Sequence, residues 1–281
     1  MQNTLNKIAE KNSLTLQGFK PLSGGDINAV YVLKCTEGNF VVKLNDAAKF
    51  PDMFKAEAKG LQLLASSESF TIPKVLSTGE EKSKSYLLLE NIPKGTKNVE
   101  FWPFFAENLA KLHRTTQNNF GLEHDNYIGS LKQVNGSEKT SADFYIQQRL
   151  KPQFALAKEN GFSFQNIEQF YATLSAEIPN EPPSLIHGDL WNGNYLVSGT
   201  GKPVLIDPAV AFASREMDLA MMQLFGGFPE EVFSVYNEIY ALDNGWERRI
   251  PLFQLYYVLV HLNIFGRGYL PQVQTILHSL G

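Results

Sequence analysis

The dominant spacing of apolar residues along the chain changes from strand-like to helical near residue 92. Before that point, short runs have the composition and alternation of β-strands, and one stretch at 53–66 repeats its apolar residues at helical spacing. The strand-like runs lie at 14–16 with 20–22, 29–35, 40–44, 74–76 and 86–90. A small antiparallel sheet with one inserted helix is therefore predicted for residues 1–92.

Helical periodicity dominates after residue 92. Two short strand-like runs interrupt it, at 194–197 and 203–206, and are expected to form a hairpin. The pattern predicts an α+β fold with a sheet lobe at 1–92 and a helical lobe at 93–281. The expected helices lie at 101–114, 141–160, 166–178, 217–225, 230–242, 246–265 and 271–280.

Composition excludes several classes of protein. The 281 residues carry a net charge of -4, which argues against nucleic-acid binding and favours a cationic substrate. A single cysteine, Cys35, excludes an intrachain disulfide and is expected to be a packed strand thiol. We find no signal peptide, and polar residues interrupt the apolar stretch 252–265. A cytoplasmic protein without a membrane partner is expected; a monomer is favoured, although the oligomeric state stays open.

Residues 185–194 hold the motif with the most chemical content. Asp189 follows His187 by two positions, and Asn194 follows Asp189 by five. This is the spacing of a kinase catalytic loop, in which the Asp accepts the proton of an attacking hydroxyl and the Asn binds Mg²⁺. A polar turn with helix-capping side chains is the alternative explanation. His187 itself is expected to be a structural residue beneath the loop.

Asp207 closes the second run of the expected hairpin, thirteen residues after Asn194. A hairpin returns the chain, so Asp207 is predicted to be the second Mg²⁺ ligand, because this hard cation prefers oxygen ligands. A strand-rich lobe, a helical lobe and this loop together predict a two-lobed protein-kinase-like fold that uses ATP and Mg²⁺.

The first lobe is predicted to hold ATP. Lys43 lies on the expected strand at 40–44 and Glu57 on the following helix, fourteen residues later. A strand lysine paired with a helix glutamate would hold the α- and β-phosphates. A surface lysine and a surface glutamate are the alternative.

Two further nucleotide contacts are predicted from position alone. Gly24 and Gly25 occupy the place of a phosphate-covering turn, without the full G-x-G-x-x-G pattern, and ordinary hairpin chemistry explains them equally. The carbonyl of Glu90 and the N–H of Ile92 could bind the adenine edge, and an ordinary edge strand is the competing explanation.

Three departures argue against a regulated protein kinase. Gly188 stands where an arginine would bind a phosphorylated activation loop, and Pro208 follows Asp207 where Phe-Gly is expected. Only eight residues separate Asp207 from Glu216, which leaves no room for an activation segment. A permanently assembled site for a small hydroxyl compound is predicted.

The chain resembles the fructosamine kinase (ketosamine-3-kinase) family. The resemblance runs from about residue 23 to 269 and includes residues 187–194, 206–209 and 215–221. It implies phosphorylation of the 3-hydroxyl of a ketoamine such as a fructosamine or ribulosamine, free or protein-bound. The 3-phosphate is unstable, so the amine is released, which amounts to deglycation repair.

The resemblance also implies substrate residues. Trp191 would stack on the sugar or its linker, and His261 would line the pocket, although both could be core residues. Glu216 and Asp218 could bind a substrate amine or cap the next helix, with the cap favoured for Asp218. Rival functions are an aminoglycoside- or choline-type phosphotransferase and an inactive nucleotide-binding scaffold.

Overall fold

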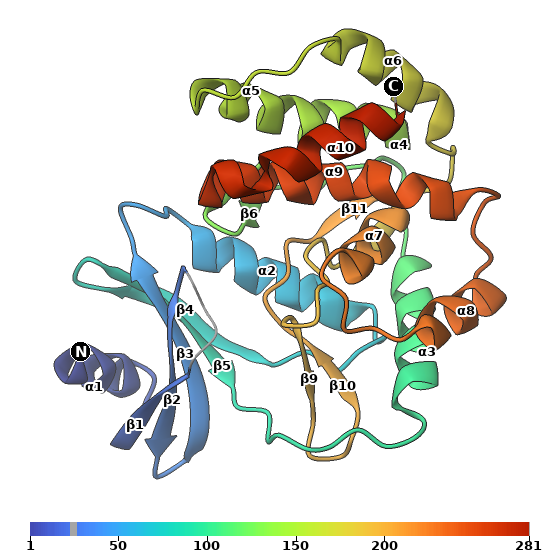
Figure 1. Cartoon of the computed structure of the whole chain (residues 1–281). Helices are drawn as coiled ribbons and strands as arrows, with labels where there is room; N and C mark the ends of the chain where they lie inside the picture. The colour runs from blue at the N-terminus through green and yellow to red at the C-terminus, as the bar shows by residue number, and fades with distance from the viewer. Residues whose placement is uncertain (23–26, 281) are drawn as a thin grey trace. The chain divides into compact units, whose positions relative to one another are not determined.

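The computed structural model describes residues 1–22 and 27–280. The chain divides into two compact units, which are described separately (Figure 1). The first unit combines Met1–Asn98 with Tyr195–Asp207, and the second combines Val99–Asn194 with Pro208–Gly281. The division between 92 and 93 stays a prediction. Within the described residues, no helix has the length and apolar character needed to cross a bilayer.

An antiparallel five-stranded sheet forms the first unit, with the strand order β1-β2-β3-β5-β4. The inserted helix α2, Met53–Ser66, lies where the sequence predicts it. The strands are β1, Leu16–Leu22; β2, Ala29–Cys35; β3, Gly38–Asp46; β4, Val75–Glu81; and β5, Lys84–Glu90.

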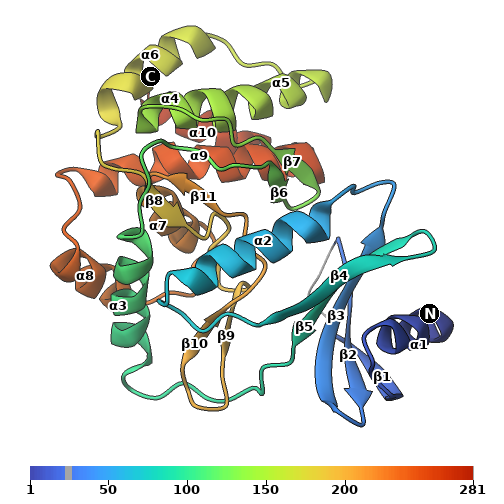
Figure 2. The same ribbon diagram turned by 180° about the vertical axis from the view of Figure 1, so that it is seen from behind.

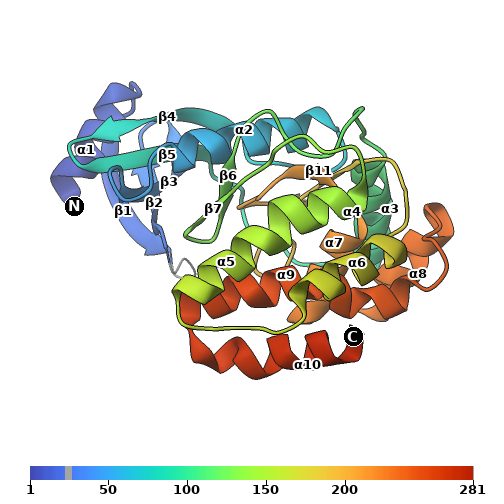
Figure 3. The same cartoon turned by 90° about the horizontal axis from the view of Figure 1, so that it is seen from above.

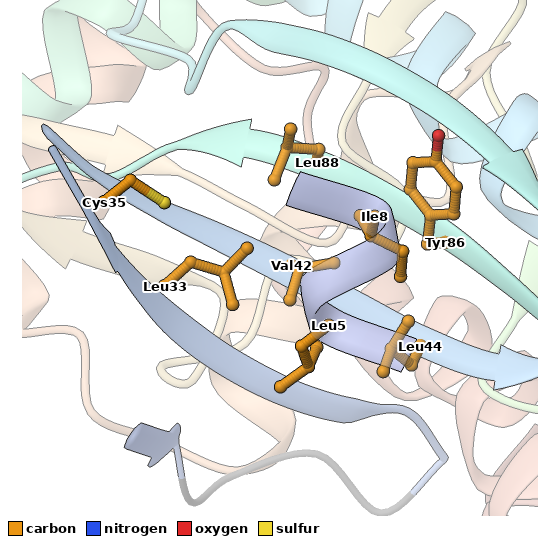
Figure 4. Packing of buried hydrophobic residues seen from close by; sticks show 8 residues of the cluster. All are labelled: Leu5, Ile8, Leu33, Cys35, Val42, Leu44, Tyr86 and Leu88. Carbon is orange, nitrogen blue, oxygen red and sulfur yellow. The ribbon is translucent and has the colours of Figure 1, made fainter. Parts of the chain in front are cut away.

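Each face of this sheet carries one helix (Figure 2). On β3, Val42 and Leu44 join the apolar cluster against α1, Gln2–Lys11. Val41 packs on the opposite face, against the cluster of α2. Because side chains alternate along a strand, Lys43 faces α2 as well. Figure 4 shows eight residues of the α1 cluster: Leu5, Ile8, Leu33, Cys35, Val42, Leu44, Tyr86 and Leu88.

Helix α1 was not expected from the sequence. Only three of its residues, Leu5, Ile8 and Ala9, are buried, so its apolar stripe is narrow and its sequence reads as polar. The strand β1 covers the expected run at 20–22 but only Leu16 of the expected run at 14–16, and its pairing shifts register between Leu16 and Gly18.

A hairpin from the later sequence completes the first unit. Its strands are β9, Tyr195–Val197, and β10, Pro203–Leu205, which pair antiparallel as predicted. Leu205 N–H donates to the carbonyl of Thr71 at 3.1 Å, so the hairpin is bonded to the chain between α2 and β4. Asp207, two residues after the end of β10, also belongs to the first unit.

The second unit is mainly helical. Its long helix α9, Trp246–Phe265, packs against α5, α7 and α10, and Figure 3 shows it between α5 and α10. The expected helix at 141–160 is continuous but contains one π-helical turn, η1. The other bounds are α3, Phe101–His113; α4, Ser141–Phe144; η1, Tyr145–Leu150; α5, Lys151–Glu159; α6, Ile167–Glu177; α7, Glu216–Leu224; α8, Glu230–Ile239; η2, Arg267–Tyr269; and α10, Leu270–Leu280.

Two short strand pairs in this unit are missing from the sequence prediction. The pair β6, Asn126–Ile128, and β7, Leu131–Gln133, forms a hairpin. The other pair joins β8, Ser184–Ile186, to β11, Ala211–Ala213. Three-residue strands are too short to show a period. The β8–β11 pair matters because the 187–194 loop leaves the end of β8.

Candidate active site

Lys43 of β3 lies between two carboxylates of the first unit. Its Nζ is 2.6 Å from Oε1 of Glu57 on α2 and 2.9 Å from Oδ1 of Asp207. The side chains of Lys43 and Glu57 are 5% and 10% exposed, whereas that of Asp207 is 47% exposed. Asp207 therefore presents carboxylate surface to solvent while it holds the ammonium.

The electrostatics of this cluster keep Lys43 charged. Burial alone would lower the pKa of Lys43, but Asp207 and Glu57 outweigh that effect and raise the pKa above its ordinary value. Burial raises the pKa of Glu57, and the Lys43 ammonium opposes that rise. The result is a fixed positive charge on the α2 face of the sheet.

Asp207 sits in an unusual backbone conformation. Its φ is +55°, in the left-handed region that non-glycine residues rarely occupy, although Asp tolerates it better than most. Strained backbone of this kind is concentrated at functional sites. In this conformation, two residues after the end of β10, the carboxylate forms its ion pair with Lys43.

In the second unit, Asp189 and Asn194 come together within the loop that follows β8. The Asn194 side-chain amide donates to the Asp189 carbonyl at 2.8 Å and to Asp189 Oδ2 at 3.0 Å. Asn194 is buried, so the amide orientation is fixed. Its NH₂ group is committed to Asp189, and its carbonyl oxygen is the group that can face a hard cation.

The loop backbone is fixed from below. His187 is fully buried, and its Nδ1 accepts from the Asp189 N–H at 3.3 Å, which is the structural position expected for it. The carboxylate of Asp218 on α7 accepts from the His187 N–H at 2.7 Å and the Gly188 N–H at 2.8 Å. One buried carboxylate therefore holds the two residues that precede Asp189.

Gly188 cannot be replaced without moving the chain. Its φ is +80°, and a Cβ atom there would lie 2.1 Å from the carbonyl oxygen of Ala209. The Ala209 N–H donates to the His187 carbonyl at 2.9 Å. This close approach of two backbones explains why glycine, rather than the arginine of protein kinases, precedes Asp189.

A second layer supports Asp218. Its Oδ2 lies 3.2 Å from Nε2 of His113 on α3, and Nδ1 of His113 lies 2.8 Å from the hydroxyl of Tyr236 on α8. Burial lowers the pKa of His113, against the pull of Asp218, so the imidazole is neutral near pH 7. The neutral tautomer that satisfies both partners donates from Nε2 and accepts at Nδ1.

Aromatic rings extend from the same loop. Trp191 contacts Phe225 edge-on at 6.4 Å between centroids, and Phe225 lies 5.0 Å from the ring of His261. Phe265 and Tyr269 lie 5.5 Å and 5.1 Å from His261. Phe225 and Phe265 are 42% and 53% exposed, so this aromatic cluster of five rings is open to solvent at one side.

His261 has a defined hydrogen-bonding state in that cluster. Its Nδ1 lies 2.7 Å from the Tyr257 carbonyl, which requires Nδ1–H to donate. Burial lowers the pKa of His261, so the ring is neutral near pH 7 and Nε2 is its acceptor nitrogen.

Glu216 does not have the substrate role that the resemblance suggested. It is fully buried, and its two carboxylate oxygens bind Nε and Nη2 of Arg249 at 2.9 and 2.6 Å. We therefore assign Glu216 to an ion pair of the core. The cap role for Asp218 is also wrong, because the N-cap of α7 is Arg215 and Asp218 lies inside the helix.

Two pairs of residues are predicted to cover the phosphates and to bind adenine. Gly24 and Gly25 lie outside the described residues. Glu90 ends β5, with its N–H donating to the Lys74 carbonyl at 2.9 Å, and Ile92 follows in a partly exposed segment. The adenine contact of these two residues stays a prediction.

Sequence reasoning missed the supports of the loop. Asp218 carries a signal that could have found it, because it lies between the apolar residues Met217 and Leu219 and so faces the core. A buried carboxylate needs hydrogen-bond donors, and backbone N–H groups of a loop can supply them. His113 gives no such signal, since a histidine near the end of an amphipathic helix has many explanations.

The chain is similar to known proteins of one family. The fructosamine kinase family model matches residues 1–280. A relative in Enterococcus faecium, named "probable ketoamine kinase", is 38% identical over 265 residues, covering 92% of this chain and 94% of the relative. A solved structure described as a fructosamine-3-kinase of Haemophilus somnus has a TM-score of 0.90 at 29% identity, covering 100% of this chain and 97% of the other.

A more distant structure supports the fold alone. The aminoglycoside phosphotransferase APH(4)-Ia has a TM-score of 0.65 at 16% identity, covering 99% of both chains. The predicted α+β, protein-kinase-like fold is thus confirmed, as is the kinase class with ATP as cosubstrate. With the family model spanning nearly every residue, this chain belongs to the fructosamine kinase family.

Proposed function

We propose that this kinase transfers the γ-phosphoryl group of ATP to the 3-hydroxyl of a ketoamine, a fructosamine or a ribulosamine. The single observation that carries the proposal is the pairing of Asp189 with Asn194 in a rigid loop, in a chain of the fructosamine kinase family. The 3-phosphate would then eliminate and free the amine, so the physiological role would be deglycation.

Asp189 is proposed as the residue that accepts the proton of the attacking hydroxyl. The Asn194 amide donates to Asp189 Oδ2 and so holds the carboxylate within the loop. A general base of this kind contributes about 10²–10⁴-fold to the rate. Positioning matters as much as basicity, because phosphoryl transfer depends on alignment of the attacking oxygen.

Lys43 is proposed to bind the α- and β-phosphates of ATP, with Glu57 holding the ammonium in place. The support is the 2.6 Å pair and the burial of both side chains, which removes water that would screen the charge. Gly24 and Gly25 are proposed to cover the phosphates. The Glu90 carbonyl and the Ile92 N–H are proposed to bind the adenine edge.

Asn194 and Asp207 are proposed to hold Mg²⁺. The residues fit a hard cation: one supplies an amide carbonyl oxygen and the other a half-exposed carboxylate, and Mg²⁺ keeps sites for phosphate and water. When bound, the ion would neutralise charge on the transferring phosphoryl group. In this structure, Lys43 forms an ion pair with one carboxylate oxygen of Asp207.

The acceptor is proposed to lie against the aromatic cluster. Trp191 belongs to the same loop as Asp189, and its ring offers a face on which a sugar or its linker can stack. His261 adds a neutral nitrogen acceptor for a hydroxyl or an ammonium of the substrate. Both of these roles are our proposal.

Release of ADP in a coupled assay tests the substrate class. The panel should contain fructosyl-lysine, ribulosyl-lysine, choline and kanamycin, with unmodified lysine as the matched control. We expect turnover with a ketoamine and none above background with lysine. Turnover confined to kanamycin or choline would instead assign an aminoglycoside- or choline-type phosphotransferase, and no turnover with any acceptor would favour the inactive scaffold.

A further inference from the structure

A buried hydrogen-bond network in the second unit ends on Ala209, whose backbone contacts the two residues before Asp189. The side-chain amide of Gln133, at the end of β7, is at its centre. Its Nε2 donates to the Asn126 Oδ1 at 2.7 Å and to the Ala209 carbonyl at 3.2 Å, while its Oε1 accepts from the Tyr256 hydroxyl at 2.6 Å. Every polar atom of this amide is therefore committed.

Ala209 connects that amide to the loop through the two peptide groups that flank it. Its carbonyl oxygen, in the peptide with Val210, accepts from Gln133 and lies 2.1 Å from the position of a Cβ on Gly188. Its N–H, in the peptide with Pro208, donates to the His187 carbonyl. A change in the backbone of Ala209 therefore disturbs the two residues before Asp189. The hairpin β6–β7 and the pair β8–β11 belong to the same unit (Figure 2).

Further buried groups fix the amide network. Asn126 donates to the Val210 carbonyl at 2.8 Å, and Asn135 donates to Asn126 Oδ1 at 3.0 Å. Arg149, in η1, donates to Asn135 Oδ1 at 2.7 Å and to the Val134 carbonyl at 2.6 Å. Gln133, Asn126, Asn135 and Arg149 are each at most 4% exposed. Buried polar groups are costly unless satisfied, so this network specifies one arrangement.

We propose that Gln133 and Tyr256 are positioning residues for Asp189, acting through the backbone of Ala209. Neither touches the acceptor in this proposal. Tyr256 fixes which way the Gln133 amide faces, and the amide fixes the Ala209 carbonyl beneath Gly188. The inference rests on the proposed role of Asp189 as the proton acceptor, and extends it to residues from β7 and α9.

The first test is Gln133→Met, which keeps an unbranched side chain and removes the amide. Misplacement of a reacting group by about 1 Å can cost about 10²-fold, so we expect kcat to fall about tenfold, with KM for ATP and acceptor within about twofold. The matched control is Gln153→Met, because Gln153 is equally buried and accepts from Asn263 at 2.9 Å. A wild-type kcat in Gln133→Met, or an equal loss in the control, would overturn the proposal.

A double variant separates positioning from general damage. If Gln133 acts through Asp189, adding Gln133→Met to Asp189→Asn should cost little more than Asp189→Asn alone. If the fold reduction in kcat of the double variant equals the product of the two single-variant reductions, the proposal is contradicted. Tyr256→Phe provides the same test with a smaller change, and it decides the matter if Gln133→Met does not fold.

Hydrogen exchange gives a result that does not depend on the substrate. We expect backbone amides of residues 187–189 to exchange faster in Gln133→Met and in Tyr256→Phe than in wild type or Gln153→Met. Unchanged exchange in both variants would refute the proposal even if activity fell. If wild type transfers no phosphate to a ketoamine but exchange responds as expected, the substrate assignment fails and the positioning role stands.

Discussion

Replacing Lys43 by Met isolates the energetic role of the buried ion cluster. The substitution retains the packing of the stem but leaves Glu57, 10% exposed, without the ammonium at 2.6 Å. Removing one partner of a buried pair costs about 3–5 kcal/mol. Asp207 is 47% exposed and regains water, so it adds little. We expect a loss of about 3 kcal/mol or more in the free energy of unfolding.

Urea denaturation of the wild type, of Lys43→Met and of a double variant measures this loss. The double variant Lys43→Met with Glu57→Met removes the orphaned charge and should recover most of the stability. The deficit of the single variant should also shrink as pH falls, because burial raises the pKa of Glu57 and a protonated Glu57 needs no cation. Neither variant should have kinase turnover, because both lack the Lys43 ammonium proposed to bind the phosphates. The double variant therefore separates the loss of phosphate binding from the loss of stability. A single-variant loss under about 1 kcal/mol, or a double variant equally unstable, would refute this reasoning.

Three further predictions concern the loop and its supports. Asp189→Asn should retain ATP binding and lose about a hundredfold or more in kcat, and undiminished turnover would remove the base assignment. Asp207→Ala should abolish magnesium-dependent nucleotide binding, measured by calorimetry with and without Mg²⁺; unchanged affinity for Mg-ATP would count against the ligand role. Burial lowers the pKa of His113, so the unfolded chain binds the proton first and wild type should lose stability as pH falls from about 6.5 towards the folded pKa. His113→Gln should reduce this dependence, and equal urea midpoint shifts in both proteins between about pH 7.5 and about pH 5.5 would contradict it.

Local sequence patterns predicted the parts of the site that depend on one element or one turn. Lys43 is recognisable because a charged residue interrupts the apolar run 40–44, and Glu57 because it lies on the next helix. Asp189 and Asn194 are recognisable by their spacing within one loop. In each case the informative residues are close in sequence or joined by a regular element.

The supports of the loop could not be predicted in the same way. Gln133 meets Ala209, 76 residues later, and Tyr256 meets Gln133 across 123 residues. These pairings depend on how three-residue strands and helices pack, and no local period encodes them. The observed partners of Glu216 and Asp218 are equally distant, because each residue binds a group about thirty residues away in sequence.

Transfer of a labelled γ-phosphate from ATP to fructosyl-lysine tests the central claim most directly. We expect the label to appear on the ketoamine with wild-type protein, followed by release of free lysine, and to fall about a hundredfold or more with Asp189→Asn. A wild-type protein that leaves the ketoamine unlabelled, or an Asp189→Asn variant that labels it at the wild-type rate, would contradict the account.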